Sequence, residues 1–390
     1  MDIYSELKSK AAKKFNRNAS EFESFFSPGR VNLIGEHVDY NGGLVLPCPL
    51  DFGTMGVAVK NTDEIVRCYS ENFDEVGVVE FAIDEIKKDP KENWVGFVKG
   101  IILEMVEDGF VFNNGFDLYI KGSIPNGAGL SSSASLDLLI GTLLRDFYYL
   151  DYSNLDLVLI GQRCEHHYIG VNCGIMDQFV IGMGQNKKAI LLNTNNLKYD
   201  YCDCDFGKYQ IVIGNTNYRR TLADSKYNER RSECEEGLQI LKQYIDISCL
   251  CDLSVEQFEL LKDKIPSEVI RKRVKHVVYE NNRTKVDFQA LQNRDFVKFG
   301  QLLNQSHKSL KEDYEVTGLA LDSLVSAFQD EDILGARMTG AGFGGCMIAL
   351  VEKDKTANIL PRVNEKYFKL CGLKADFYIA NVGSGACKID

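Results

Sequence analysis

Apolar residues recur at two spacings along the first half of the chain, one typical of strands and the other of helices. Segments rich in β-branched and aromatic residues predict strands over residues 25–34, 44–50, 55–60, 65–69 and 77–82. Apolar side chains three or four positions apart, beginning with Trp94, predict an amphipathic helix over residues 93–107. Phe116, Leu118 and Ile120 form an alternating segment that predicts another strand.

The rest of the chain is richer in helical patterns. A long apolar run, residues 136–150, predicts a buried helix soon after the last of those strands. A second helix is expected over residues 154–169 and a strand over residues 189–193. The remaining expected elements are a strand at 209–214, helices at 227–244, 267–283, 296–309 and 319–328, and strands at 346–351 and 376–380.

This mixture of strands and helices predicts the α+β class. At about 150 residues per domain, the 390 residues are enough for two domains. The polar, aspartate-rich stretch at 193–208 is the best candidate for a boundary, which gives domains 1–200 and 201–390 with a cleft between them. A hydrophobic content of 45% and a charged content of 26% are those of an ordinary soluble globular protein.

The net charge of −11 provides no global field that would attract nucleic acid or anionic lipid, so neither is an expected partner. An anionic ligand must then be bound by a local group of residues, such as a phosphate-binding loop. The 12 cysteines are scattered, and the close pairs Cys202/Cys204 and Cys249/Cys251 lack a partner pair at zinc-finger spacing. No signal peptide and no apolar run of about 20 residues is apparent, so we expect a cytoplasmic protein with free thiols.

Residues 124–136 combine a strand end, a small-residue loop and a helix start, the features of a phosphate site. They read Ile-Pro-Asn-Gly-Ala-Gly-Leu-Ser-Ser-Ser-Ala-Ser-Leu. Gly127 and Gly129 let the backbone approach an anion, and unpaired N–H groups at a helix start favour negative charge. No Gly-Lys-Ser/Thr follows, so this first glycine-rich loop is not a Walker loop. An N-capped helix after a glycine-rich turn is an alternative reading.

A second dense segment is Gly-Arg-Val-Asn-Leu-Ile-Gly-Glu-His-Val-Asp-Tyr-Asn-Gly-Gly, residues 29–43; we call residues 35–43 the polar turn. Glu36, His37 and Asp39 lie within four residues, where the carboxylates would repel each other unless they are engaged. Ring hydroxyls of a neutral sugar donate to carboxylates, and directional hydrogen bonds select one epimer. A capped polar turn without a ligand is the alternative.

Two further segments carry candidate chemistry. Asp177 lies in Cys-Gly-Ile-Met-Asp-Gln, and a catalytic role there would need an arginine partner and a hydroxyl to act on. Glu165 lies twelve residues earlier on a predicted helix, about three turns away. Residues 337–346 form a second glycine-rich loop, whose glycines indicate close backbone approach to a ligand or to the first loop.

Taken together, these segments resemble the galactokinases, a branch of the GHMP family of small-molecule kinases. Three motifs occur in family order, at residues 29–47, 125–135 and 334–350. Residues 174–178 and 275–315 also look like galactokinase, so the resemblance covers nearly the whole chain. It implies a two-domain α+β fold with ATP and galactose in the cleft, Mg²⁺ as a cofactor, and a monomer that phosphorylates the anomeric hydroxyl.

The resemblance also implies roles for single residues. The ATP phosphates would be held by Gly127, Ala128, Gly129, Leu130, Ser131, Ser132 and Ser133. Ser70 and Trp94 would lie near the nucleotide, and Ser133 and Glu165 would bind Mg²⁺. The sugar would be held by Glu36, His37, Val38, Asp39, Gly174 and Tyr227. Asp177 would act at the anomeric hydroxyl, with Arg30 steadying Asp177 and the transferring phosphoryl group.

Several alternatives stay open at this point. Val38 stands where the family usually has threonine, at a position whose backbone should face the sugar. Asp177 could accept the proton directly or mainly orient the hydroxyl. A kinase for N-acetylgalactosamine or galacturonic acid is a rival reading, and so is a sugar- and ATP-binding sensor without catalysis, although Arg30, Ser133, Glu165 and Asp177 are all present.

Overall fold

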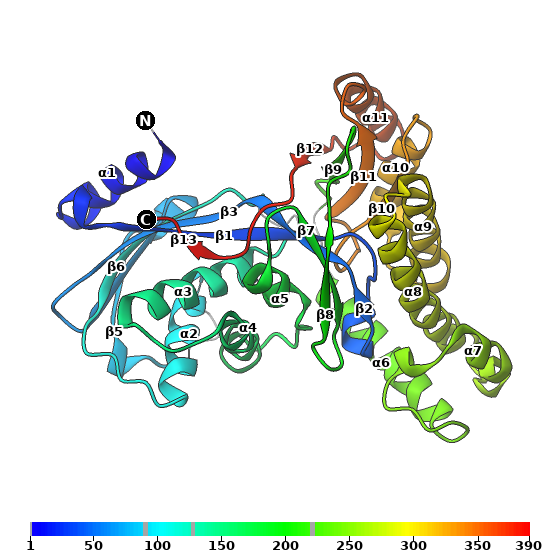
Figure 1. The fold of residues 1–390 in the computed structure, drawn as a ribbon, viewed down its shortest axis with the longest axis horizontal. Helices are drawn as coiled ribbons and strands as arrows, with labels where there is room; N and C mark the ends of the chain where they lie inside the picture. The colour runs from blue at the N-terminus through cyan, green and yellow to red at the C-terminus, as the bar shows by residue number, and fades with distance from the viewer. Residues whose placement is uncertain (1, 89–92, 126–128, 219–222) are drawn as a thin grey trace.

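The computed structural model describes residues 2–88, 93–125, 129–218 and 223–390, and it contains mixed sheets and helices (Figure 1). Its largest sheet has six strands in the order β13-β1-β3-β6-β4-β5. Their bounds are Cys387–Lys388, Glu23–Asn32, Pro47–Lys60, Phe116–Gly122, Ile65–Ser70 and Val79–Ala82. Neighbours in this sheet are antiparallel, except that β4 runs parallel to β6.

Helices cover both faces of this sheet. Alternate residues of β3 point to opposite faces, as the period of a strand requires. Met55, Val57 and Val59 share a buried cluster with α1 (Ile3–Phe15), whereas Ala58 lies in the main core with the helices of the other face. Those helices are α2 (Val95–Glu107), α3 (Ser132–Tyr148), α4 (Asn154–Arg163) and α5 (Met176–Met183).

The second half of the chain forms a four-stranded antiparallel sheet in the order β10-β11-β9-β12. Its strands span Gly335–Met338, Cys346–Glu352, Tyr209–Asn215 and Asp376–Ala380. The helices of this half are α6 (Ala223–Leu241), α7 (Val255–Leu261), α8 (Glu268–Gln292), α9 (Phe296–Ser309), α10 (Gly318–Gln329) and α11 (Thr356–Cys371). No helix in the described ranges has both the length and the apolar character needed to cross a membrane.

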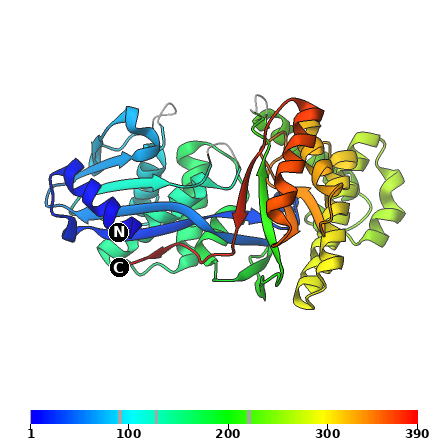
Figure 2. The ribbon, with the colours of Figure 1, turned by 90° about the horizontal axis from the view of Figure 1, so that it is seen from above.

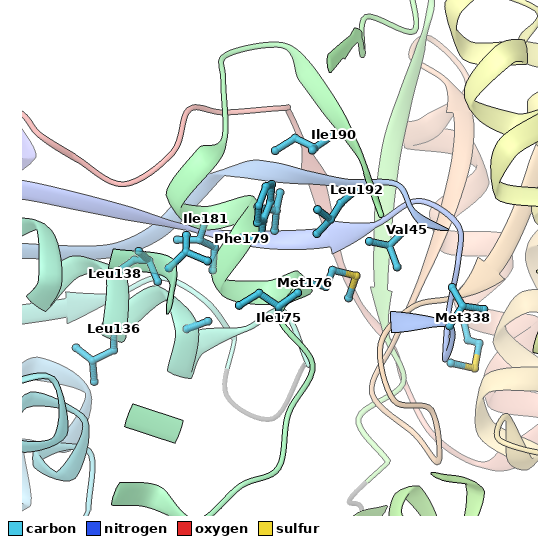
Figure 3. Packing of buried hydrophobic residues seen from close by; sticks show 14 of the residues in the cluster. Val45, Leu136, Leu138, Ile175, Met176, Phe179, Ile181, Ile190, Leu192 and Met338 are labelled. Carbon is cyan, nitrogen blue, oxygen red and sulfur yellow. The ribbon is translucent and has the colours of Figure 1, made fainter. Parts of the chain in front are cut away.

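A small sheet, β2-β7-β8, joins the two halves; its strands are Leu44–Val45, Lys188–Asn193 and Tyr199–Asp203. Val45 of β2 and Leu192 of β7 share the main core with Ile175, Met176 and Phe179 at the start of α5 (Figure 3). Apolar side chains therefore surround the first turn of α5 on the side away from solvent. This packing holds the backbone of Asp177, the second residue of α5, in place.

The two ends of the chain lie close together, because the segment after β12 runs back along the molecule to β13 (Figure 2). β13 pairs with β1, with Phe25 opposite Lys388, and the Asp390 carboxylate lies 2.6 Å from Lys8 Nζ. The final residues thus complete the first sheet. The division into domains 1–200 and 201–390 stays a prediction, and β8 spans the proposed division point.

Several expected elements differ from the structure. Segments 44–50 and 55–60 become the short β2 and one long β3, because the chain continues as a strand through Gly53. The helix expected over 154–169 ends at Arg163 and continues as a π-helix over Cys164–Ile169. The polar stretch 193–208 contains β8, which pairs with β7 and is not a free linker.

Other elements escaped the sequence pattern. α11 carries buried Ile359, Val363 and Tyr367 at helical spacing, but Pro361 within it is a residue that normally interrupts helices. β10 and β13 have four and two residues, too few to show a period. The buried helix expected over 136–150 begins earlier, at Ser132, which places Ser132 and Ser133 in its first turn.

Candidate active site

An ion pair between Arg30, in β1, and Asp177, in α5, lies at the centre of the candidate site. Arg30 donates from Nε to Asp177 Oδ1 at 2.7 Å and from Nη2 to Oδ2 at 2.5 Å. Its Nη1 donates to the Gly129 carbonyl at 2.9 Å, and the Ser131 hydroxyl donates to Asp177 Oδ2 at 2.5 Å. Arg30 is buried, whereas the Asp177 side chain is 30% exposed. The arginine fork therefore fixes a carboxylate that stays open to a ligand.

The first glycine-rich loop delivers the start of α3 to this ion pair. Gly129 has φ 75°, and Ser131, the N-cap residue, has the left-handed angles φ 63° and ψ 49°. Ser132 and Ser133 follow in the first turn, where helix N–H groups have no helical partner. The Leu130 side chain is buried in the core, and its carbonyl accepts from the Arg30 N–H at 3.2 Å. Gly127 and Ala128, also predicted here, lie outside the described residues.

Three cavities adjoin one another around this helix start. A cavity of about 290 Å³ is lined by Ser70, Trp94, Ser132 and Ser133, among others. A larger cavity of about 920 Å³ shares Ser132 and Ser133 with it and also has Gly129, Ser131 and Glu165 in its wall. A third cavity of about 130 Å³ has Arg30 and Asp177 in common with the large one. The arrangement suits a nucleoside, its phosphates and a small acceptor in that order.

Glu165 lies in the π-helix Cys164–Ile169, with its carboxylate in the wall of the large cavity. Burial and the nearby Asp177 raise the pKa of Glu165 to about 7, although a hydrogen bond from Ser133 acts in the opposite direction. The Gln178 amide donates to Glu165 Oε1 at 3.3 Å. The Ser133 hydroxyl and the Glu165 carboxylate both line the large cavity, and they are oxygen ligands of the kind that Mg²⁺ prefers.

The histidines next to Glu165 have other partners. His166 Nε2 lies 2.9 Å from the Cys173 carbonyl, and His167 Nδ1 lies 3.0 Å from Glu104 Oε1. Glu104 also pairs with Arg163 at 2.7 Å. Both histidines therefore have protein partners of their own.

The small cavity is lined by five of the six predicted sugar residues: Glu36, His37, Asp39, Gly174 and Tyr227. Burial, with the carboxylates of Asp177 and Glu36, raises the pKa of Asp39 to about 7. A Cβ on Gly174 would lie 2.0 Å from Asp39 Oδ2, so only glycine allows this approach.

His37 has the left-handed angle φ 61°, rare for a residue with a side chain. Its ring lies against those of Tyr227 and Tyr314, and its Nδ1 is 2.8 Å from the Tyr40 hydroxyl. Burial lowers the pKa of His37 to about 3, so the ring is neutral near pH 7. It therefore offers the cavity a neutral hydrogen-bonding group.

Two predicted sugar residues have contacts outside the small cavity. The Val38 side chain is buried in the main core and is absent from the cavity wall, while its carbonyl accepts from the Asn41 and Gly43 N–H groups. The Glu36 carboxylate reaches the cavity, but its Oε1 already accepts from the Thr339 hydroxyl at 3.1 Å and the Gly340 N–H at 2.8 Å. Glu36 thus connects the polar turn to the second glycine-rich loop.

The second glycine-rich loop approaches the first loop, one of the two alternatives expected for it. Gly340 and Ala341 line the small cavity, and a Cβ on Gly340 would lie 3.4 Å from the Gly129 carbonyl. Sequence reasoning gave no role to Cys173, Gln178 or Asn215, which also line the large cavity. Gln178 follows Asp177 directly, so its place in the motif was the signal that could have found it.

Three family models match the chain: "Galactokinase galactose-binding signature" at residues 12–60, "GHMP kinases N terminal domain" at 96–185 and "GHMP kinases C terminal" at 287–369. A galactokinase of Lactococcus lactis subsp. lactis (strain IL1403) is 50% identical over 389 residues, covering 100% of this chain and 97% of the relative. A galactokinase of Clostridium perfringens (strain SM101 / Type A) is 48% identical over 384 residues, covering 98% and 99%.

Solved structures agree with these relatives. The crystal structure of Lactococcus lactis galactokinase complexed with galactose matches with a TM-score of 0.96 at 49% identity, covering 99% of this chain and 100% of that one. A mevalonate kinase matches with a TM-score of 0.65 at 20% identity, over 93% and 99%, and shares the fold alone. These matches confirm the expected α+β, two-domain fold of the GHMP kinases. The chain belongs to the galactokinases of the GHMP kinase family.

Proposed function

We propose that Arg30 and Asp177 form the reacting centre at which this galactokinase transfers the γ-phosphoryl group of ATP to the anomeric (C1) hydroxyl of galactose, giving galactose 1-phosphate and ADP. The observation that carries the proposal is the position of this ion pair on the wall common to the 920 Å³ and 130 Å³ cavities. A hydroxyl in the small cavity and a phosphate in the large one would meet there. The names of the relatives favour galactose over a related sugar, and they favour an enzyme over a sensor.

Phosphoryl transfer goes through a loose transition state, so positioning and charge neutralisation carry most of the catalysis. Asp177 would hold the C1 hydroxyl and take its proton as the new oxygen–phosphorus bond forms. Arg30 reaches Asp177 with two nitrogens and keeps the carboxylate oriented as an acceptor. The same guanidinium borders the phosphate cavity, where its charge would offset the negative charge of the phosphoryl group.

The sugar would be bound by His37, Asp39 and Tyr227, whose polar groups line the small cavity. Glu36 would contribute mainly through its second carboxylate oxygen, because Oε1 is engaged with Thr339 and Gly340. Val38 would act through its backbone alone, which makes its departure from the usual threonine of little consequence for the sugar. Gly174 would contribute because its lack of a side chain leaves room for the Asp39 carboxylate.

The nucleoside would occupy the cavity beside Ser70 and Trp94, with the phosphates along Gly129, Ser131, Ser132 and Ser133. Ser133 and Glu165 have the right donors and position for Mg²⁺, which when bound would neutralise phosphate charge. In the large cavity, the described charged side chains are Arg30, Glu165 and Asp177, so a tetra-anionic nucleotide needs an added cation there. A monomeric state and a cytoplasmic location stay predictions.

An ADP-release assay over free sugars tests the proposal. Galactose and glucose differ at the C4 hydroxyl, and each polar group of the site left unpaired by glucose costs about 1–3 kcal/mol. Two such groups predict a kcat/KM for galactose roughly 10² or more above that for glucose. Comparable values for the two epimers would remove the galactose assignment. Higher values for N-acetylgalactosamine or galacturonic acid would transfer the assignment to that sugar.

A further inference from the structure

A stripe of polar side chains runs along the buried face of α8. His276, Glu280, Thr284 and Asp287 are spaced four, four and three residues apart, which places them on one side of the helix. All four are fully buried. Buried polar groups are costly unless they are paired, so a stripe of this length indicates specific partners. We call these four residues the α8 stripe.

Two residues of the stripe, Glu280 and His276, have partners in the polar turn, some 240 residues away in the chain. Glu280 Oε1 accepts from the backbone N–H of Gly35 at 3.1 Å and of Glu36 at 3.3 Å. His276 Nε2 lies 3.1 Å from the Glu36 carbonyl, and since a carbonyl only accepts, this nitrogen carries the hydrogen. Gly35 itself is pressed against the helix, because a Cβ there would lie 3.0 Å from Thr284 Oγ1.

Glu280 is the centre of this contact. Besides the two backbone donors, it accepts from the Ser306 hydroxyl at 2.6 Å and from Arg283 Nε at 2.8 Å. Although burial opposes ionisation, Arg283 and other neighbouring groups lower the pKa of Glu280 to about 2. A charged, fully buried carboxylate with four donors therefore binds the first two residues of the polar turn, Gly35 and Glu36. Hydrogen bonds to a charged acceptor are the stronger kind.

The other side of Glu36 is held as firmly. Arg337 Nη2 lies 2.9 Å from Glu36 Oε1, and Arg337 Nη1 donates to the Leu33 carbonyl at 2.7 Å. With Thr339 and Gly340 on the same oxygen, the backbone and side chain of Glu36 are fixed by residues from the second half of the chain. The next residue, His37, adopts φ 61°, a conformation that persists only where the surroundings enforce it.

We propose that Glu280 is a positioning residue that sets the polar turn through the Gly35 and Glu36 amides and so presents His37 and Asp39 to the sugar. This inference rests on the proposed function of the small cavity. Its specific consequence is that Glu280 affects the affinity for one substrate and not for the other. Described residues of the polar turn line the small cavity, and none of them lines the large cavity or the one beside Ser70 and Trp94, so Glu280 acts on the affinity for galactose and leaves that for ATP unchanged.

The central test is Glu280→Gln, which keeps the size of the side chain but removes its charge. The new amide N–H group would face N–H and O–H groups that donate to the carboxylate in the parent. We expect KM for galactose to rise by about tenfold or more, because hydrogen bonds to a charged group are lost. KM for ATP should stay within about twofold, since a positioning effect on the sugar turn is specific to one substrate. Glu280→Asp, which keeps the charge, should recover part of the galactose affinity.

A matched control separates positioning from loss of stability. Glu331→Gln also removes a largely buried carboxylate, one that pairs with Arg362 at 2.6 Å and Lys366 at 3.0 Å between α10 and α11. It should lower the melting temperature without raising KM for galactose. If Glu280→Gln does not fold, Ser306→Ala carries the test, because it removes one donor from Glu280; a rise of a few-fold in KM for galactose is then expected.

Hydrogen exchange of the peptide that contains Gly35 and Glu36 gives a readout that needs no catalysis. Exchange there should be faster in Glu280→Gln than in the parent and in Glu331→Gln. An unchanged KM for galactose with unchanged exchange would overturn the inference while the proposed function stands. A parent enzyme that does not phosphorylate galactose would overturn the proposed function, and exchange of the turn would still decide the role of Glu280.

Discussion

The Ser131 hydroxyl donates to Asp177 Oδ2, so the first glycine-rich loop is bonded directly to the carboxylate proposed to act on the sugar. Ser131 was expected to bind phosphate, but its side chain has a protein partner 2.5 Å away. Together with Arg30, it leaves Asp177 with three donors. The loop that would hold the nucleotide thus also orients the group that would hold the acceptor.

Removing the Ser131 hydroxyl should therefore impair catalysis. In Ser131→Ala we expect kcat to fall by about tenfold, the effect of one lost hydrogen bond to a charged group. Ser131→Gly loses the same hydroxyl but suits φ 63° better, so it should be more stable than the alanine variant by about 1 kcal/mol. Steady-state kinetics and thermal unfolding of the pair check this. Full kcat in both variants would leave Asp177 oriented by Arg30 alone.

Asp177→Ala should leave the fold and ATP binding nearly intact and lower kcat by at least about 10² to 10⁴, the range of a positioned acid–base group. The expectation rests on the two-nitrogen contact with Arg30 and on the position of Asp177 between two cavities. Arg30→Lys is the companion variant, because one ammonium cannot reproduce the fork. Retention of more than about a tenth of kcat in Asp177→Ala would take Asp177 out of the mechanism.

Ser133→Ala and Glu165→Ala should each raise the Mg²⁺ concentration needed for half-maximal rate. Each variant removes one oxygen from a hard cation that has few protein ligands. Galactose affinity measured without nucleotide should change little, which is the control for folding. If both variants titrate with Mg²⁺ as the parent does, the cation is held by other groups.

The pH dependence of galactose affinity should follow Asp39, whose pKa is raised from its usual 3.8 to about 7. Sugar hydroxyls donate best to the ionised carboxylate, so KM for galactose should rise as the pH falls below 7, by up to about tenfold per pH unit. Asp39→Asn should raise KM for galactose at pH 8 and flatten this dependence. A parent enzyme with constant KM for galactose between pH 5.5 and 8 would contradict the role of Asp39.

The same shift has a consequence for stability. Because the folded-state pKa lies above the unfolded value, ionisation of Asp39 opposes folding, and its cost in folding free energy grows as the pH rises from 3.8 to about 7 and is constant above that. Asp39→Asn should therefore increase the melting temperature at pH 8 and have little effect near pH 4. The site would then trade stability for an ionised acceptor beside the sugar.

The sequence alone determined the class of fold and the main chemical segments. Long periodic patterns, such as residues 296–309, predicted helices that the structure reproduces, because 14 residues display several turns of the apolar spacing. The density of polar groups in residues 35–43 and the two glycines in residues 124–133 predicted the two proposed substrate regions. These signals are local, and neighbouring residues suffice to carry them.

The tertiary structure decided which groups meet. Arg30 and Asp177 are 147 residues apart, and Glu280 lies 245 residues from Gly35, so no local pattern joins them. The α8 stripe shows why: His276, Glu280 and Thr284 look like the polar side of an exposed helix until a partner covers them. Packing also buries the side chains of Val38 and Leu130 in the core and places the Asp39 carboxylate beside Gly174. Burial, and with it the raised pKa of Asp39 and Glu165, depends on contacts that only the folded chain makes.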